Sequence, residues 1–302
     1  MDKLTQLLQQ QPTVLADGAM GTRLFDLGLQ FGAAPEMWNL EHPQRVQEVH
    51  ESYLQAGAKI LLTNTFGANR FRLALHNLQP RVRELNLAAA AIARSAVEAR
   101  APDALVAGDI GPSGGILAPL GDMEYTDAVA GFAEQAAALV EGGVDVIWIE
   151  TLSALEEMQS AIEGVRQVAP DMPIIATMTF DTHGRTMMGV TPEQAASALP
   201  GMGAMAIGGN CGNGPDEILA VIEKMRGVAP QAVLVAKANA GIPRWEAGRS
   251  LYGAGPDDMA EYALGVAGAG ARIIGACCGS TAEHLKAMAV ALQEKEPMAR
   301  GR

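Results

Sequence analysis

The chain has 302 residues, 49% of them apolar, and a formal net charge of −12. This acidic excess argues against nucleic acids and anionic membrane surfaces as partners. No apolar stretch reaches membrane-spanning length, and the first twelve residues lack the basic start and long apolar core of a signal peptide. We therefore expect a cytoplasmic protein with a sizeable core, no nucleic-acid partner and no membrane association.

Eight short apolar runs alternate with longer segments of helical pattern. The runs are continuously apolar, which is typical of parallel strands covered on both faces. The predicted strands are residues 14–17, 59–64, 105–109, 144–150, 174–179, 204–210, 233–239 and 272–277. Eight such units predict a single (β/α)8 barrel over residues 1–302, with its core at about 13–293. A doubly wound open sheet is the alternative.

The segments between the runs carry helix start and stop signals. Pro43, Pro215 and Pro256 stand at first helical positions, and Gly57 marks the end of the first of these helices. Thr126 is a candidate N-cap. Capping-box spacing occurs three times, at Ser153 with Glu156, Thr191 with Gln194, and Ser280 with Glu283.

All three cysteines stand at the ends of predicted strands and beside glycine. Cys211 follows the sixth strand, and Cys277 with Cys278 ends the eighth. A lone cysteine in such a place is most often a buried core residue. A disulfide is disfavoured because the number is odd and adjacent cysteines are strained partners. Three thiols that meet at one point suit zinc, so we predict all three as ligands of one Zn²⁺ per chain.

In a barrel of this kind the reactive groups lie at the carboxyl ends of the strands. That rim would carry Asp17, Asn64, Asp109, Glu150 and Asn239 beside the thiols. Three thiolates leave the fourth position of zinc open, as in catalytic sites. Such a site is a poor Lewis acid, but it suits a substrate thiol whose sulfur must attack an alkyl donor. We expect alkyl transfer to a thiol.

Eight short motifs lie at or near these strand ends. They are residues 17–22 (DGAMGT), 63–68 (TNTFGA), 108–114 (GDIGPSG), 150–151 (ET), 178–181 (MTFD), 209–212 (GNCG), 238–241 (ANAG) and 275–281 (GACCGST). Together they resemble the homocysteine S-methyltransferase family over about residues 13 to 293, and the two cysteine motifs are highly specific. Within the family the chain looks most like the homocysteine-binding module of cobalamin-dependent methionine synthase. Betaine-homocysteine methyltransferase is a more distant relative.

The resemblance implies a (β/α)8 barrel that methylates homocysteine to methionine at a zinc site with three cysteine ligands. It implies that Asn239 lies close to the metal. Asp17 and Glu150 would lie near the amino group of homocysteine. The turn of Gly18, Ala19, Met20, Gly21 and Thr22 would lie near its carboxylate.

Elementary chemistry agrees with this assignment, because two carboxylates suit the ammonium of a zwitterion while its carboxylate rests on backbone N–H groups. In the alternative interpretation, Asp17 and Glu150 only cap backbone amides or pair with an arginine. Asn64 and Asp109 rank second as substrate contacts, because such residues more often hold loops.

The methyl donor stays open between two classes. Cobalamin-dependent methionine synthase holds its cobalamin on other domains, for which this chain has no surplus residues, so methylcobalamin would sit on a separate partner protein. A small onium compound such as betaine or S-methylmethionine is the other class. Betaine needs an aromatic cage, which Trp38 and Tyr125 could build, although Gly67 stands where the betaine enzymes have a tyrosine.

Two other functions remain as alternatives: a non-catalytic module that binds homocysteine or zinc, and a methyltransferase for another thiol. The long second and third βα connections offer surface for a homo-oligomer.

Overall fold

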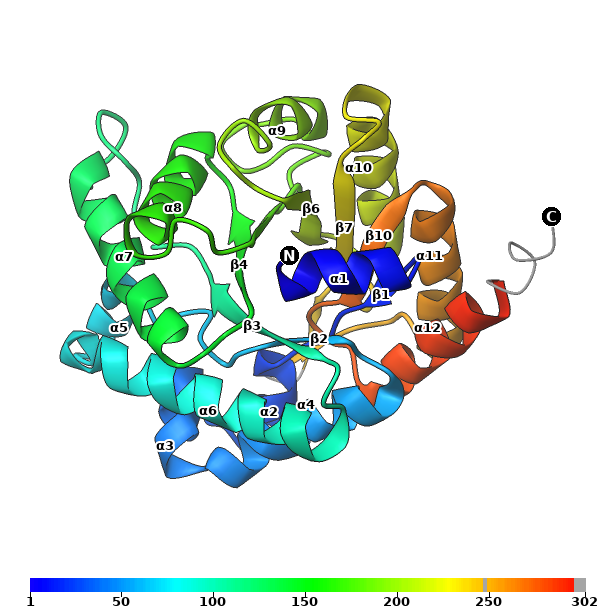
Figure 1. The fold of residues 1–302 in the computed structure, drawn as a ribbon, viewed down its shortest axis with the longest axis horizontal. Helices are drawn as coiled ribbons and strands as arrows, with labels where there is room; N and C mark the ends of the chain where they lie inside the picture. Colours follow the sequence, from blue (N-terminus) through cyan, green and yellow to red (C-terminus); the bar gives the residue numbers. More distant parts are fainter. Residues whose placement is uncertain (247–248, 296–302) are drawn as a thin grey trace.

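In a computed structural model of the chain, which describes residues 1–246 and 249–295, eight parallel strands form one sheet that closes on itself (Figure 1). The strands are β1 (Val14–Leu15), β2 (Ile60–Leu62), β3 (Leu105–Ile110), β4 (Val146–Leu152), β5 (Ile174–Met178), β6 (Ala206–Cys211), β7 (Val233–Ala238) and β10 (Ala271–Ala276). All eight predicted strands are confirmed.

The sheet runs in the order β1-β10-β7-β6-β5-β4-β3-β2. Its two ends are joined by a parallel bridge between Ala16 and Ile60, and the N–H of Lys59 donates to the carbonyl of Leu15 at 2.7 Å. This closure confirms the (β/α)8 barrel and excludes the open sheet.

Helices surround the strands as a ring (Figure 1). The longer ones are α4 (Pro43–Ala56), α6 (Val82–Arg100), α7 (Tyr125–Glu141), α8 (Leu155–Val168), α10 (Pro215–Val228), α11 (Pro256–Gly268) and α12 (Ala282–Lys295). Shorter elements are α2 (Gly21–Asp26), α3 (Trp38–Glu41), α5 (Arg70–Ala74), α9 (Pro192–Ala198) and two 3-10 turns, Pro35–Met37 and Gln79–Arg81. An antiparallel pair, β8 (Arg244–Glu246) with β9 (Arg249–Leu251), follows β7. Among the described residues no helix is both long and apolar enough to cross a bilayer.

Several helix ends follow the predicted signals. Pro43, Pro215 and Pro256 each begin a helix, and Gly57 ends α4 in the left-handed conformation. The capping box of Thr191 with Gln194 is formed on α9.

Three cap predictions are wrong. α7 begins at Tyr125 after Glu124, so Thr126 lies inside the helix. α8 begins after Ala154, without a side-chain cap from Ser153. Ser280 does not cap α12, because its buried hydroxyl donates to the carbonyl of Cys277 at 2.8 Å and accepts from the N–H of Ala19 at 3.0 Å.

The interior of the barrel is filled by side chains that alternate along each strand. Its lower layers are apolar and include Val146 and Trp148 of β4 and Val235 of β7. Helix α1 (Lys3–Gln10) adds Leu4 and Leu7 to this cluster, so it covers the end of the barrel opposite the carboxyl ends of the strands. On β3, β4 and β7 the next inward positions carry polar residues of the site, Asp109, Glu150 and Lys237.

Candidate metal centre and adjoining pocket

The three thiols lie together at the carboxyl ends of β6 and β10. The sulfur atoms of Cys211, Cys277 and Cys278 all lie within 4.8 Å of one another, and those of Cys211 and Cys277 are 3.0 Å apart. Sulfurs bound to one tetrahedral Zn²⁺ at roughly 2.3 Å would lie about 3.8 Å apart. The thiols therefore meet as the sequence predicted, and their number and chemistry fit one such ion, although the sulfurs of Cys211 and Cys277 lie closer together than two zinc-bound sulfurs would.

Local backbone geometry brings the thiols together. Cys211 leaves β6 in the left-handed region, with φ of 61°, a conformation that costs a non-glycine residue on the order of 1–3 kcal/mol and is concentrated at functional sites. The N–H of Cys277 donates to the carbonyl of Ala238 at 2.7 Å, and the carbonyl of Cys278 accepts from the N–H of Ala240 at 2.9 Å. The end of β7 thus fixes the cysteine pair between the strands.

The three thiols share their protons. The pKa of Cys278 is held well below its usual range, because hydrogen bonds from Cys211 and then Cys277 stabilise its thiolate. Hydrogen bonding to the other two sulfurs, together with burial, raises the pKa of Cys211 well above its usual range. One thiolate therefore forms readily, and full ionisation requires a cation to replace the remaining protons.

A pocket of about 190 Å³ opens beside the thiols. Its lining contains all three cysteines and the predicted residues Asp17, Gly18, Ala19, Met20, Gly21, Asn64, Asp109 and Glu150. Thr22 is not in the lining, and its hydroxyl accepts from the N–H of Gly279 at 3.2 Å. Asn239 lies just outside it: its amide group donates to the carbonyl of Gly212 at 2.7 Å, and its Oδ1 is buried without a partner.

A buried lysine, which the sequence analysis did not single out, lines the same pocket. The Nζ of Lys237 lies 3.2 Å from Oδ1 of Asp17 and 3.7 Å from Oε2 of Glu150. The other oxygen of Asp17 accepts from the N–H of Leu62 at 2.7 Å. Asp17 therefore caps a backbone amide and pairs with a cation, as the alternative interpretation held, but the cation is a lysine and not an arginine.

Two other acids keep free oxygens in this pocket. Oδ1 of Asp109 and Oε2 of Glu150 are buried without a hydrogen-bond partner. Burial raises the pKa of Glu150 to about 7, and burial together with the charge of Glu150 raises the pKa of Asp109. Buried polar atoms without partners are rare. A cationic donor such as an ammonium would satisfy both.

The sequence matches the family model of homocysteine S-methyltransferase over residues 14–292. The chain belongs to the homocysteine S-methyltransferase family. The expectation of a methyltransferase is thereby confirmed.

Similar proteins agree with the family. Methionine synthase of Mycobacterium leprae (strain TN) is 32% identical over 306 aligned residues, which cover 95% of this chain and 25% of that protein. Methionine synthase of Mycobacterium tuberculosis (strain ATCC 25618 / H37Rv) is 33% identical over 296 residues, with 93% and 25% covered. The chain thus spans about a quarter of the length of these relatives.

Two solved structures show the same fold. The metallated form of the homocysteine methyltransferase MmuM from Escherichia coli has a TM-score of 0.81 at 24% identity, with 96% of this chain and 99% of that chain covered. A methyltransferase from Methanosarcina mazei has a TM-score of 0.63 at 14% identity, with 97% and 98% covered. Both comparisons support the barrel.

In this family member the second-ranked Asn64 holds a loop, as expected. Its amide group donates to the carbonyl of Pro35 at 2.9 Å and to Oδ1 of Asn39 at 3.0 Å. Glu36, which sequence reasoning missed, also lines the pocket and accepts from the N–H of Gly67 at 2.8 Å. These contacts shape the β2 side of the pocket.

The aromatic cage that Trp38 and Tyr125 could have built is not formed. Trp38 is buried beneath Arg45, whose guanidinium carbon lies 4.9 Å from the ring centroid. The hydroxyl of Tyr125 donates to Glu163 of α8 at 2.8 Å. Neither side chain lines the thiol pocket, where Phe66 is the one aromatic among the described lining residues.

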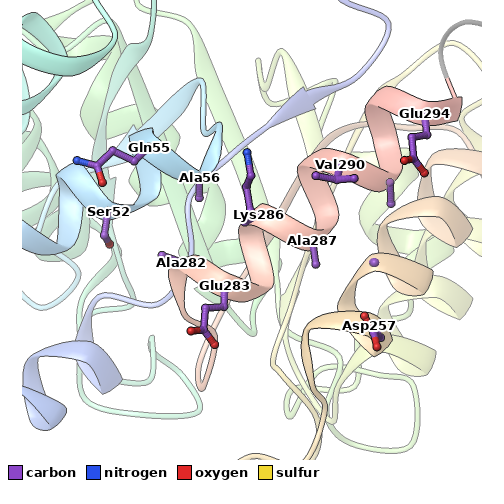
Figure 2. A pocket seen from close by; sticks show the side chains of 12 residues that line it. Ser52, Gln55, Ala56, Asp257, Ala282, Glu283, Lys286, Ala287, Val290 and Glu294 are labelled. Atoms are coloured by element: carbon purple, nitrogen blue, oxygen red, sulfur yellow. The ribbon is translucent and has the colours of Figure 1, made fainter.

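A larger hollow of about 670 Å³ lies outside the barrel, between α4, α11 and α12 (Figure 2). Its lining is rich in alanine and includes Lys286 and Val290 of α12. No cysteine is among its described lining residues, so it lacks the thiols on which zinc chemistry depends.

Proposed function

We propose that the chain binds one Zn²⁺ through Cys211, Cys277 and Cys278 and transfers a methyl group to the sulfur of homocysteine, which forms methionine. The observation that carries this proposal is the meeting of three thiols beside a pocket in which two buried acids each have an oxygen without a hydrogen-bond partner. Zinc bound there would lower the pKa of the substrate thiol and keep its sulfur nucleophilic. The thiol would release its proton to solvent, and its sulfur would form a bond to the methyl carbon as the bond between that carbon and the donor breaks, which leaves the demethylated donor.

The pocket would hold homocysteine by both ends of its zwitterion. Glu150 and Asp109 would accept hydrogen bonds from the ammonium, since each has a buried oxygen without a partner. The Gly18 to Gly21 turn also lines the pocket and leads into α2. Its backbone N–H groups would receive the carboxylate, except that of Ala19, which already donates to Ser280. Asn239, with its free Oδ1, would complete the surroundings of the metal.

The donor would approach from a second cavity of about 460 Å³ at the same rim. The two cavities share Thr151 in their linings. The second cavity is bordered by exposed apolar side chains, Ile116 at 50%, Leu120 at 77% and Met187 at 72% exposure. Exposed apolar clusters of this kind are typical of protein contacts, and none of the described residues lining the cavity is aromatic.

These features favour methylcobalamin carried by a separate corrinoid protein over betaine, whose quaternary ammonium needs aromatic rings. A small onium compound is the second donor class. In the experiment, zinc-loaded protein and homocysteine are incubated with one donor at a time, which is a corrinoid protein that carries methylcobalamin, betaine or S-methylmethionine. The methionine that forms is then measured. Methionine formed with betaine or S-methylmethionine alone would overturn the corrinoid proposal. Bound zinc and homocysteine without methylation from any donor would favour the non-catalytic module.

Metal analysis tests the zinc site independently of activity. We expect near-stoichiometric zinc in the wild type and a sharp loss in Cys211→Ser and Cys278→Ser, because each removes one of three ligands. Unchanged zinc in both variants would contradict the site. The need for reduced thiols also fits the proposed cytoplasmic location.

A further inference from the structure

We infer that Lys237 is a positioning residue: its buried ammonium engages Asp17 and balances the acid cluster so that Glu150 and Asp109 remain available to the ammonium of an amino-acid thiol. This inference rests on the proposed function and deepens it. It separates two roles among the acids, with Asp17 as the partner of the lysine and the other two as contacts of the substrate.

The geometry places Lys237 within the barrel, on the inner face of β7. Its side chain is 3% exposed, and its Nζ lies 5.1 Å from the ring centroid of Trp148 in the layer below. The stem passes Gly275 of β10, where a Cβ would lie 3.1 Å from the Cγ of Lys237 and 2.9 Å from the carbonyl of Asp17. Glycine at this position leaves the space that the lysine occupies.

Hydrogen bonding distinguishes the three acids. Both oxygens of Asp17 have a partner, one in the N–H of Leu62 and the other in Lys237. Oε2 of Glu150 forms an ion pair with the lysine at 3.7 Å but no hydrogen bond, and Oδ1 of Asp109 has no hydrogen bond. An incoming ammonium therefore finds acceptors without hydrogen bonds on Glu150 and Asp109, whereas both oxygens of Asp17 already accept one.

Charge explains why the lysine is needed. Three buried carboxylates cannot all remain ionised without a nearby cation, because burial and mutual repulsion favour the protonated acids. Burial raises the pKa of Asp17, and the charge of Lys237 opposes that shift. Without the lysine the cluster would take up protons, and a protonated acid is a weak partner for an ammonium. Lys237 would thus determine whether the pocket prefers thiols that carry an amino group.

The test compares two ligands that differ in the amino group. Binding of homocysteine and of 4-mercaptobutyrate to zinc-loaded protein is measured by calorimetry in the wild type, Lys237→Met and Val235→Ala. Val235 lies two residues earlier on the same inner face of β7 and carries no charge. It therefore controls for packing loss.

We expect the wild type to prefer homocysteine. Lys237→Met should reduce that preference about tenfold or more, with unchanged zinc content and unchanged affinity for 4-mercaptobutyrate, because only the ammonium contact is lost. Val235→Ala should lower thermal stability and keep the preference. If Lys237 had only a structural role, its replacement would change the affinities for homocysteine and 4-mercaptobutyrate equally.

The outcomes separate the two proposals. If the wild type binds neither thiol, or shows no preference for homocysteine, the proposed function fails. If the wild type prefers homocysteine and folded Lys237→Met keeps the same preference, the inference about the lysine is wrong. If Lys237→Met does not fold, Asp17→Asn is tested in its place. The released lysine would then turn to Glu150 and weaken the preference for homocysteine. An unchanged preference in this variant would overturn the inference.

Discussion

Replacing Glu150 by glutamine tests the ammonium site most sharply, because activity and stability should move in opposite directions. The substitution keeps the shape of the side chain and removes its charge. A hydrogen bond to a charged group contributes about 1.5–3 kcal/mol, so its loss should raise the KM for homocysteine about tenfold to 150-fold. The KM for 4-mercaptobutyrate, which lacks the amino group, should not change.

Stability of the metal-free protein should rise in the same variant. Burial raises the pKa of Glu150 from 4.5 to about 7, so folding favours its protonated form. The native state therefore binds the proton more tightly, and stability falls as pH rises from about 4.5 to about 7. Above pH 7 this cost amounts to roughly 3 kcal/mol, which Glu150→Gln would remove.

Steady-state kinetics with both thiols and denaturant unfolding at pH 5 and pH 8 measure the two effects. The stabilisation should be present at pH 8 and nearly absent at pH 5. An unchanged KM for homocysteine in Glu150→Gln would refute the role of this acid in binding the ammonium.

Three further predictions follow from the site. In the wild type, the KM for homocysteine should rise as pH falls below about 7, because protonated Glu150 cannot pair with the ammonium; a flat profile from pH 8 to 6 would contradict this. Ser280→Ala removes a buried hydroxyl that bonds two backbone groups. Denaturant unfolding should show that the free energy of unfolding falls by about 2–4 kcal/mol. A fall of less than about 0.5 kcal/mol, roughly half of one such bond, would contradict this role of the hydroxyl. Leu120→Glu at the donor cavity should slow methylation by a corrinoid protein about tenfold or more, by charging an apolar contact, while zinc and homocysteine binding stay unchanged; an equal rate would exclude this surface.

The barrel and the meeting of the thiols could be predicted because both depend on local pattern plus one architectural rule. Continuous apolar runs identified eight parallel strands, and the carboxyl ends of such strands face one rim. Cys211 and Cys277 therefore had to approach each other, although 66 positions separate them. The left-handed turn at Cys211 could not be predicted, because non-glycine residues adopt it only where tertiary contacts hold them there.

The interactions of the acids could not be predicted in the same way. Asp17 was expected to contact substrate, but its partner Lys237 is 220 positions away, and no local rule pairs them. A signal for the lysine did exist: it stands in an apolar run, two residues after Val235 and two before Asn239, on the inward face. Ser280 carried the spacing of a helix cap, yet its buried hydroxyl bonds the nearby carbonyl of Cys277 and the N–H of Ala19, which is 261 positions away.

Helix α1 and the apolar layers above it close one end of the barrel, so reactants reach the sulfur atoms from the opposite face. In the proposed reaction, homocysteine and the methyl donor would both approach from that face. Homocysteine would enter before a bulky carrier covers the opening, and methionine would leave only after that carrier withdraws. The closed end of the barrel would thus impose an order of arrival and departure on the proposed reaction.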